Sequence, residues 1–203
     1  MDPHQDFDID RIALTHGQAR HVLAHLDLRA GENDKRFDAY LKSLRRDGLP
    51  FAKDEMGVGA GHNLVYRFEH LMELAVALAL RAQAILARDI VAVLARERDV
   101  LRPLYRRAWL ERESDLGKKH KVTIKGAKPI QASGVYLDLL MSYDKFGLLR
   151  YVEPTLLGPP EAIERFCAQY LLLRPRPPIP VSQLAIDIVP LAQGAPEIKR
   201  GRR

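Results

Sequence analysis

The chain has 203 residues and a formal net charge of +6 at pH 7, with 47% hydrophobic and 29% charged residues. This balance is typical of a globular protein and excludes a chain that is disordered throughout. The single cysteine excludes an intramolecular disulfide and a thiolate zinc cluster, and the basic charge favours an anionic partner such as nucleic acid.

Two short amphipathic helices are predicted first. Thr15 opens a capping-box sequence, and apolar residues then recur at helical spacing until an expected stop near Gly31. A second start signal follows at Asn33 or Asp34, and this helix should end at residues 47–48. The two helices are therefore expected to lie next to each other.

The second helix is predicted to carry a basic face. Its apolar stripe includes Phe37, Leu41 and Leu44, with Asp38 as the main acidic exception on the opposite side. The basic residues of that opposite side are Lys35, Arg36, Lys42, Arg45 and Arg46.

A hairpin is predicted after the second helix. Residues 49–51 and 64–66 have the character of brief strands, and the loop between them contains Gly57, Gly59 and Gly61. Such a loop fits the wing of a winged helix better than a phosphate cradle, because it leads into a strand and not into a helix.

Longer helical segments should follow. Helical spacing starts at Phe68 and, after a break around residues 83–87, continues over residues 90–101, with Pro103 expected to kink or restart the helix. The wide apolar stripe of residues 85–102 has two readings, as the seam of a dimer or as part of the core of one chain.

The second half of the chain has a different pattern. A charged run at residues 116–121 is interpreted as a domain boundary, after which the periodicity is that of strands. Strands are predicted over residues 121–125, 135–143 and 148–152, a helix from Pro159, and a last possible strand over residues 184–189.

The expected fold class is mostly α with a small β component (α+β). A winged helix-turn-helix region with its following helices should occupy residues 10–115, and a small mixed domain residues 120–192, for effector binding, dimerisation or docking. The basic residues 193–203 are expected to be a disordered tail.

The order helix, turn, helix and hairpin indicates DNA binding, because a short basic helix can enter a major groove about 12 Å wide. Lys and Arg would neutralise phosphates, which gives salt-dependent affinity but little sequence information. Sequence readout needs base-edge contacts, for which the candidates are Lys35, Arg36, Asp38, Ala39, Lys42 and Ser43. The alternative reading is a solvated helical face on a basic protein.

At this point the chain resembles the MerR family of regulators, in its residues 40–50 (YLKSLRRDGLP) and 64–71 (LVYRFEHL). The resemblance covers roughly residues 13 to 110 and implies a homodimer on a pseudo-palindromic site in double-stranded DNA, with Arg36, Tyr40, Lys42 and Arg67 touching it. The expected DNA-binding set is Lys35, Arg36, Tyr40, Lys42, Ser43, Arg45, Arg46, Lys53, His62 and Arg67. The sequence departs from the family in its long linker at residues 28–33 and in lacking the cysteines of metal-sensing members.

Other functions have less support. No Ser-His-Asp elbow, HExxH motif or convincing carboxylate pair indicates an enzyme, and no cofactor is expected. His21 and His25 have a chelating spacing, but the sequence offers no third metal ligand. The most apolar stretch, residues 71–94, is interrupted by charges, so we expect a cytoplasmic protein without a membrane partner.

The rival hypothesis from another class is an interaction protein, such as an adaptor or an antitoxin-like partner, that does not bind DNA. The sequence does not choose a small-molecule effector, and it does not decide between activator and repressor.

Overall fold

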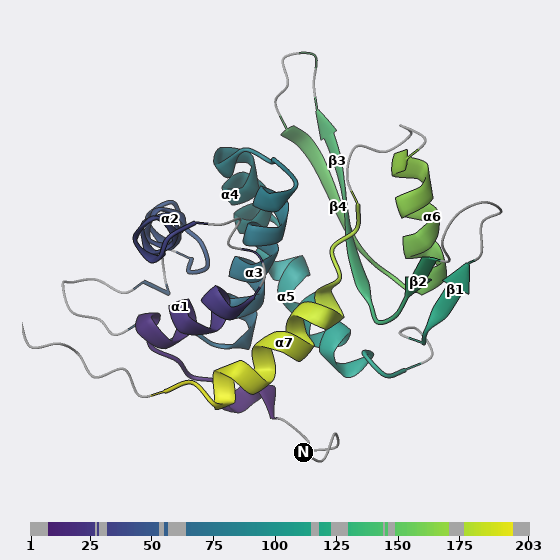
Figure 1. The fold of residues 1–203 in the computed structure, drawn as a ribbon. Coiled ribbons are helices and arrows are strands. Elements are labelled where there is room, and N and C mark those ends of the chain that lie inside the picture. The colour runs from purple at the N-terminus through teal and green to yellow at the C-terminus, as the bar shows by residue number, and fades with distance from the viewer. Residues whose placement is uncertain are drawn as a thin grey trace, which may run out of the picture.

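The computed structural model is mostly helical, with seven α-helices and two two-stranded antiparallel sheets among the residues that it describes (Figure 1). The described residues are 8–26, 28, 32–52, 55–56, 64–114, 118–122, 130–143, 145, 149–170 and 177–196.

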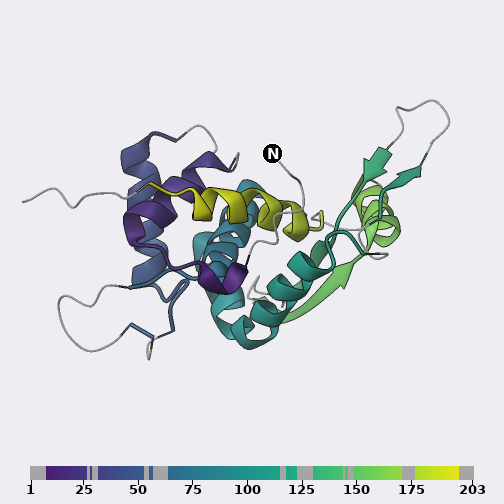
Figure 2. The same cartoon turned by 90° about the horizontal axis from the view of Figure 1, so that it is seen from below.

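The first half of the chain is helical and the sheets follow it. The helices of the first half are the 3-10 helix η1 (Ile9–Arg11) and α1 (His16–His25), α2 (Asp34–Arg46), α3 (Phe68–Ala82), α4 (Ala87–Arg96) and α5 (Arg98–Leu110). The later elements are β1 (His120–Val122), β2 (Ile130–Ala132), β3 (Tyr136–Tyr143), β4 (Leu149–Leu157), α6 (Pro159–Tyr170) and α7 (Val181–Gln193). Figures 1 and 2 both show the sheets and α6 on one side of the molecule, and α1 and α2 on the other.

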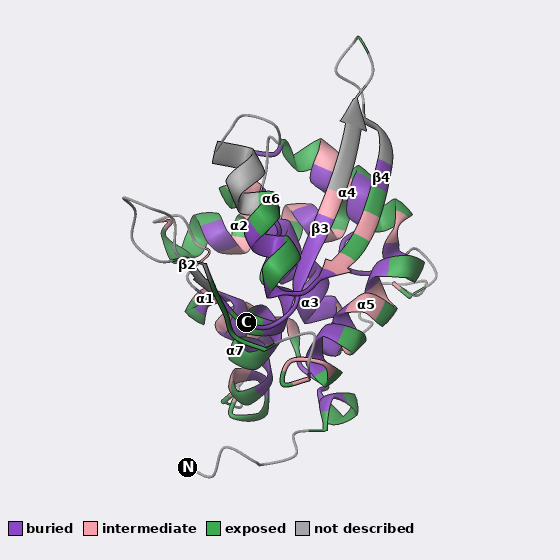
Figure 3. Cartoon of the chain, turned by 90° about the vertical axis from the view of Figure 1, so that its right-hand side faces the viewer, coloured by how far each residue is buried: buried purple, intermediate pink, exposed green. Residues whose placement is uncertain are grey.

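Helix α3 forms the centre of the helical core. Eleven of its 15 residues are buried, so it needs neighbours on nearly every side. Helices α1, α4, α5 and α7 pack against it and supply them. Figure 3 shows this central position, with α3 coloured almost entirely as buried.

The first two helices confirm the predicted starts. The Thr15 side chain accepts a hydrogen bond from the Gln18 amide at 3.4 Å, and the Gln18 side chain accepts one from the Thr15 amide at 3.0 Å, which completes the capping box. Helix α1 ends at His25, earlier than the stop expected near Gly31, a residue outside the described part of the chain.

The predicted pairing of residues 49–51 with 64–66 is wrong. Tyr66 pairs instead with Leu14 through two backbone hydrogen bonds. The Tyr66 amide donates to the Leu14 carbonyl at 2.8 Å, and the Leu14 amide donates to the Tyr66 carbonyl at 2.9 Å. Phe51 packs its ring edge-on against the Tyr66 ring, at 4.9 Å between centroids, so the two segments meet through side chains. The intervening glycine loop lies in residues 57–63, outside the described residues.

The predicted break after α3 is confirmed, but Pro103 does not restart the following helix. The restart occurs at Glu97, between α4 and α5, and α5 runs through Pro103 to Leu110. Pro103 is the sixth residue of α5, so the hydrogen bond that an amide there would donate to the Asp99 carbonyl is missing, and the helix continues despite that loss.

The second half contains the predicted strand pair and helix. Strand β3 pairs with β4 in antiparallel register from Tyr136 opposite Leu157, and β1 pairs with β2. Helix α6 packs near β1, β2 and β4. Pro154 interrupts the amide row of β4, as is usual in an edge strand.

The strand expected over residues 184–189 is wrong, because this segment lies in helix α7. The buried residues Val181, Ala185, Ile188 and Ala192 recur at helical spacing, which the run of β-branched residues had hidden. Helix α7 packs against α1, α3 and α5, so the C-terminal end of the expected second domain completes the core of the first (Figure 2). Among the described residues, no helix combines the length and apolarity that crossing a bilayer requires.

Candidate nucleic-acid interface

Helix α2 is a short, well-capped helix at the edge of the molecule (Figure 1). The Asn33 side chain accepts a hydrogen bond from the Arg36 amide at 3.0 Å and caps the N-terminus. Phe37, Leu41 and Leu44 are buried in the main core and anchor the inner face. The buried inner face therefore holds α2 in place, and the opposite face points toward solvent.

The outward face of α2 is basic, as predicted. Lys35, Arg36, Lys42 and Arg46 are exposed and Arg45 is half-buried. Lys35 and Arg36 make no ion pair with any residue in the described part of the chain. These cations can approach an anionic surface without first giving up a protein carboxylate.

Asp38 is the acidic group within this basic face, and both of its oxygens are engaged. Oδ2 lies 2.6 Å from Lys42 Nζ, and Oδ1 lies 3.2 Å from His16 Nε2 of α1. Burial raises the pKa of Asp38, but the hydrogen bonds from Lys42 and His16 outweigh it and the pKa is lowered. Asp38 is therefore an anion that ties α1 to α2.

His16 connects this cluster to the segment that precedes α3. Its Nδ1 lies 3.0 Å from the Tyr66 hydroxyl, so a neutral ring donates from Nε2 to Asp38 and accepts from Tyr66 at Nδ1. Burial and the nearby charge of Arg45 and Lys42 lower the pKa of His16 despite Asp38. We name His16, Asp38, Lys42 and Tyr66 the Asp38 cluster.

The last turn of α2 holds a smaller polar group. Ser43 Oγ donates to Asp47 Oδ2 at 3.3 Å and accepts from Arg46 Nη2 at 3.3 Å. Arg46 Nε also pairs with Asp47 at 3.4 Å. These exposed contacts are weak individually, so Ser43 and Arg46 can exchange them for contacts with a ligand.

Tyr40 does not belong to the exposed basic face, contrary to the expectation from the family resemblance. Its ring lies 4.0 Å below the Arg81 guanidinium, which also donates to Glu32 at 3.0 Å. The Tyr40 hydroxyl is buried without a hydrogen-bond partner among the described residues. Tyr40 therefore packs α2 against α3 and is not placed to touch DNA.

A buried ion pair supports the end of α2. Arg98 Nη2 donates to Glu73 Oε1 at 2.8 Å and to the Gly48 carbonyl at 2.6 Å, which joins α5, α3 and the turn after α2. Gly48 has a φ of +101°, a conformation that side chains other than glycine rarely adopt. Burial raises the pKa of Glu73 to about 7, although Arg98 and Arg102 oppose the rise.

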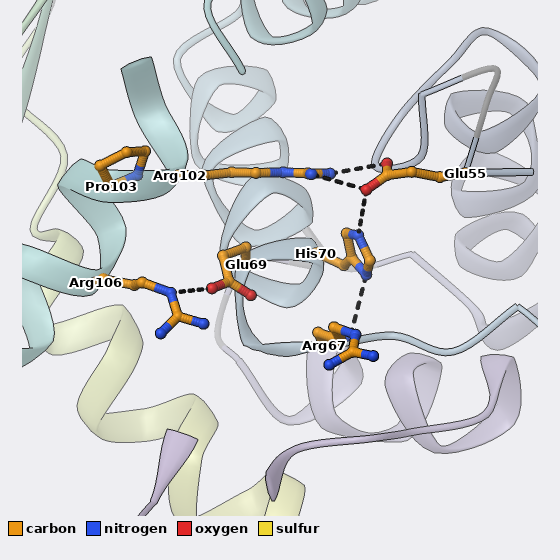
Figure 4. A pocket seen from close by; sticks show the side chains of 7 residues that line it. All are labelled: Glu55, Arg67, Glu69, His70, Arg102, Pro103 and Arg106. Carbon is orange, nitrogen blue, oxygen red and sulfur yellow. Dashed lines mark hydrogen bonds and ion pairs between the residues drawn. The ribbon is translucent and has the colours of Figure 1, made fainter. Parts of the chain in front are cut away.

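A polar pocket of about 390 Å³ lies between the start of α3 and α5 (Figure 4). Its lining residues are Glu55, Arg67, Glu69, His70, Arg102, Pro103 and Arg106. Arg102 Nη1 donates to Glu55 at 2.8 Å, and Arg106 pairs with Glu69 and with Asp10. The carboxylates thus neutralise two of the three guanidinium groups that line the pocket.

Two further contacts of this pocket fix the start of α3. His70 Nδ1 accepts a hydrogen bond from the Arg67 amide at 3.1 Å, and His70 Nε2 faces Glu55 at 3.6 Å. Burial opposes the ionisation of Glu55, yet hydrogen bonds from Arg102 and the Ala52 amide lower its pKa to about 2. The exposed Arg67 is therefore held on a fixed backbone at the start of α3.

The structure brings most of the predicted site together. Lys35, Arg36, Lys42, Ser43, Arg45 and Arg46 share α2, and Arg67 lies at the start of α3; Lys53 and His62 lie outside the described residues. Sequence reasoning missed His16 and Tyr66, which lie 22 and 28 residues from Asp38 in the sequence. His16 lies in the first turn of an expected helix, and no pattern in the sequence indicates its contact with Asp38.

The proposed dimer stripe is buried within one chain. Ile90, Val93 and Leu94 of α4 and Leu101 of α5 are at most 1% exposed and belong to the main core. For these residues the second reading, completion of one core, is therefore the correct one. Val91, a further residue of that stripe, is partly buried and packs against the same core.

No protein-family model, curated protein or solved structure matches this chain. Within the described residues, no group of three or more His, Cys, Asp and Glu side chains could hold a metal ion.

Proposed function

We propose that this protein is a sequence-specific DNA-binding transcriptional regulator that places α2 in the major groove of double-stranded DNA. The observation that carries the proposal is the position of α2, which buries only its apolar stripe and directs Lys35, Arg36, Lys42 and Arg46 outward at the edge of the molecule. A helix mounted in this way can enter a groove about 12 Å wide without unfolding its support.

The charges explain how such a complex gains affinity. Each phosphate that a Lys or Arg neutralises releases counterions, so several cations on one helix give strong and salt-dependent binding. In the proposal, exposed Arg67 at the start of α3, which also lines the pocket next to α5, adds a further phosphate contact. The segment of residues 50–66 takes the place of the wing, although residues 49–51 and 64–66 do not pair as a hairpin. The chain binds as a homodimer, as in the MerR family that it resembles.

The arrangement of the backbone supports this proposal. The Leu14–Tyr66 bridge ties the segment after the wing loop to the start of α1, and the Asp38 cluster ties α1 to α2. The two helices and the base of the wing are thus held as one unit, as a DNA-reading surface requires.

Charge reversal with a matched control tests the proposal. Lys42 and Arg107 have similarly exposed side chains, at 55% and 57%, and each forms an i,i+4 ion pair, but only Lys42 lies on α2. We expect Lys42→Glu to weaken binding to genomic DNA fragments by on the order of tenfold or more at about 0.1 M salt. Arg107→Glu should leave the affinity within about twofold. Equal loss in both variants, or loss in neither, contradicts the assignment of α2.

The rival function, a protein-binding adaptor, gives a different result in the same preparation. An adaptor purifies with a stoichiometric protein partner and enriches no DNA fragment. In fluorescence anisotropy with a labelled duplex, Lys42→Glu then gives the same signal as the wild type. Selection of bound fragments from genomic DNA distinguishes the two functions and supplies the operator at the same time.

A further inference from the structure

Asp38 is an unusual residue for a surface that binds phosphates. Its carboxylate lies among Lys42, Arg45 and His16, where it lowers the positive potential of the face. A surface selected only for attraction to DNA gains affinity by losing this acid. The presence of Asp38 is explained if its carboxylate has a function that offsets the repulsion.

The geometry limits what that function is. The Asp38 side chain is 22% exposed, much less than that of Lys42, and its two oxygens already accept from Lys42 and His16. Asp38 is therefore poorly placed to accept a hydrogen bond from a base. It is well placed to hold the Lys42 ammonium, which lies 2.6 Å away.

We propose that Asp38 is a positioning residue for sequence readout, which holds the Lys42 ammonium in one direction so that it donates to a base edge in the major groove. This inference rests on the proposed function. A lysine on a flexible stem serves equally well for any phosphate, whereas a base-edge contact needs a fixed donor. The ammonium has three donors, so two remain for the guanine O6 and N7 acceptors after one is given to Asp38.

The carboxylate is itself held from a second side. His16 Nε2 donates to the oxygen that Lys42 does not use, and His16 is in turn fixed by the Tyr66 hydroxyl at 3.0 Å. The direction of Lys42 is thus set by α1 and by the segment before α3, and not by α2 alone. The other residues of the Asp38 cluster therefore hold the Lys42 ammonium in one position.

The charge-matched control is Asp34, which lies one turn earlier on the same helix and so on the same side. Asp38→Asn and Asp34→Asn each remove one negative charge from α2, but only the first removes the carboxylate that contacts Lys42. Far-UV circular dichroism and urea unfolding check that both variants are folded. The full chain is used throughout.

The experiment is selection from a random-sequence DNA library, followed by binding titrations over a series of salt concentrations. We expect Asp38→Asn to bind random DNA at least as tightly as the wild type and with a steeper salt dependence, because Lys42 is released to contact phosphates. The selected sequences should lose their preference at one position in each half-site, predicted to be guanine. Asp34→Asn should keep that preference.

Two results would overturn this inference without affecting the proposed function. The first is an unchanged base preference in Asp38→Asn. The second is the same loss of base preference in both variants, which would mean that the removed charge, and not the contact with Lys42, causes it. A wild-type chain that enriches no sequence from the library rejects the proposed function and this inference with it. Wild-type enrichment combined with either of the first two results leaves the proposed function standing.

Discussion

Replacing Arg98 by methionine tests how the turn after α2 is supported. The change removes the three hydrogen bonds to Glu73, whose side chain is only 1% exposed, and the 2.6 Å bond to the Gly48 carbonyl. Removing one partner of a buried ion pair costs about 3–5 kcal/mol, a large part of the roughly 5–15 kcal/mol by which a domain is stable. We expect a loss in that range at pH 8.

The size of this loss should depend on pH. Burial already raises the pKa of Glu73 to about 7 from 4.5, and losing Arg98 removes a group that opposes the rise. A raised carboxyl pKa means that the folded chain binds the extra proton, so its contribution to stability is present below pH 4.5 and is lost as the pH rises through 7. The difference between Arg98→Met and the wild type should therefore be larger at pH 8 than at about pH 5.5.

The assay is urea unfolding followed by circular dichroism, with the double variant Glu73→Leu/Arg98→Met as the control. Removing the second charge should recover much of the stability, leaving a deficit of about 1–3 kcal/mol from the unsatisfied Gly48 carbonyl. A loss below about 1 kcal/mol in Arg98→Met, or a double variant no more stable than the single one, would refute the reasoning.

Two further predictions concern the same region. Asn33→Ala removes the cap of α2 and should cost about 0.5–2 kcal/mol in unfolding free energy, and the idea fails if circular dichroism and urea titration detect no change. Burial lowers the pKa of both His16 and His70 from 6.5, so the folded chain binds fewer protons and should lose stability as the pH falls below 6.5. Unfolding midpoints of the Glu73→Leu/Arg98→Met double variant, in which Glu73 no longer titrates, check this from pH 7.5 down to about 5.5. A midpoint of that variant that rises on acidification contradicts it.

The local signals in the sequence predicted much of the helical half. Thr15 and Asn33 marked helix starts because a cap involves residues only three positions apart, and the apolar stripe of α2 is read from spacing alone. The same rules found β3, β4 and α6. Each of these features depends on neighbours in the chain.

The features that sequence analysis missed depend on distant residues. Tyr66 was paired with the wrong segment because its partner, Leu14, lies 52 positions earlier. Tyr40 was expected to touch DNA because of the family resemblance, and its contact with Arg81, 41 positions later, cannot be predicted from neighbouring residues. Helix α7 was missed for a different reason. Its β-branched residues favour a strand, but packing of its buried face against the core stabilises the helix.

The most direct test of the central claim, that the basic face of α2 binds duplex DNA, is the salt dependence of wild-type binding. Each neutralised phosphate changes the slope of log K against log [salt] by about −0.9, so the exposed cations of α2 with Arg67 predict a slope of about −3 or steeper. Lys35→Ala, which removes an exposed cation of α2 that has no assigned base contact, should make that slope shallower by about 1. A flat salt dependence, or no measurable binding to any duplex in low salt, would contradict the account.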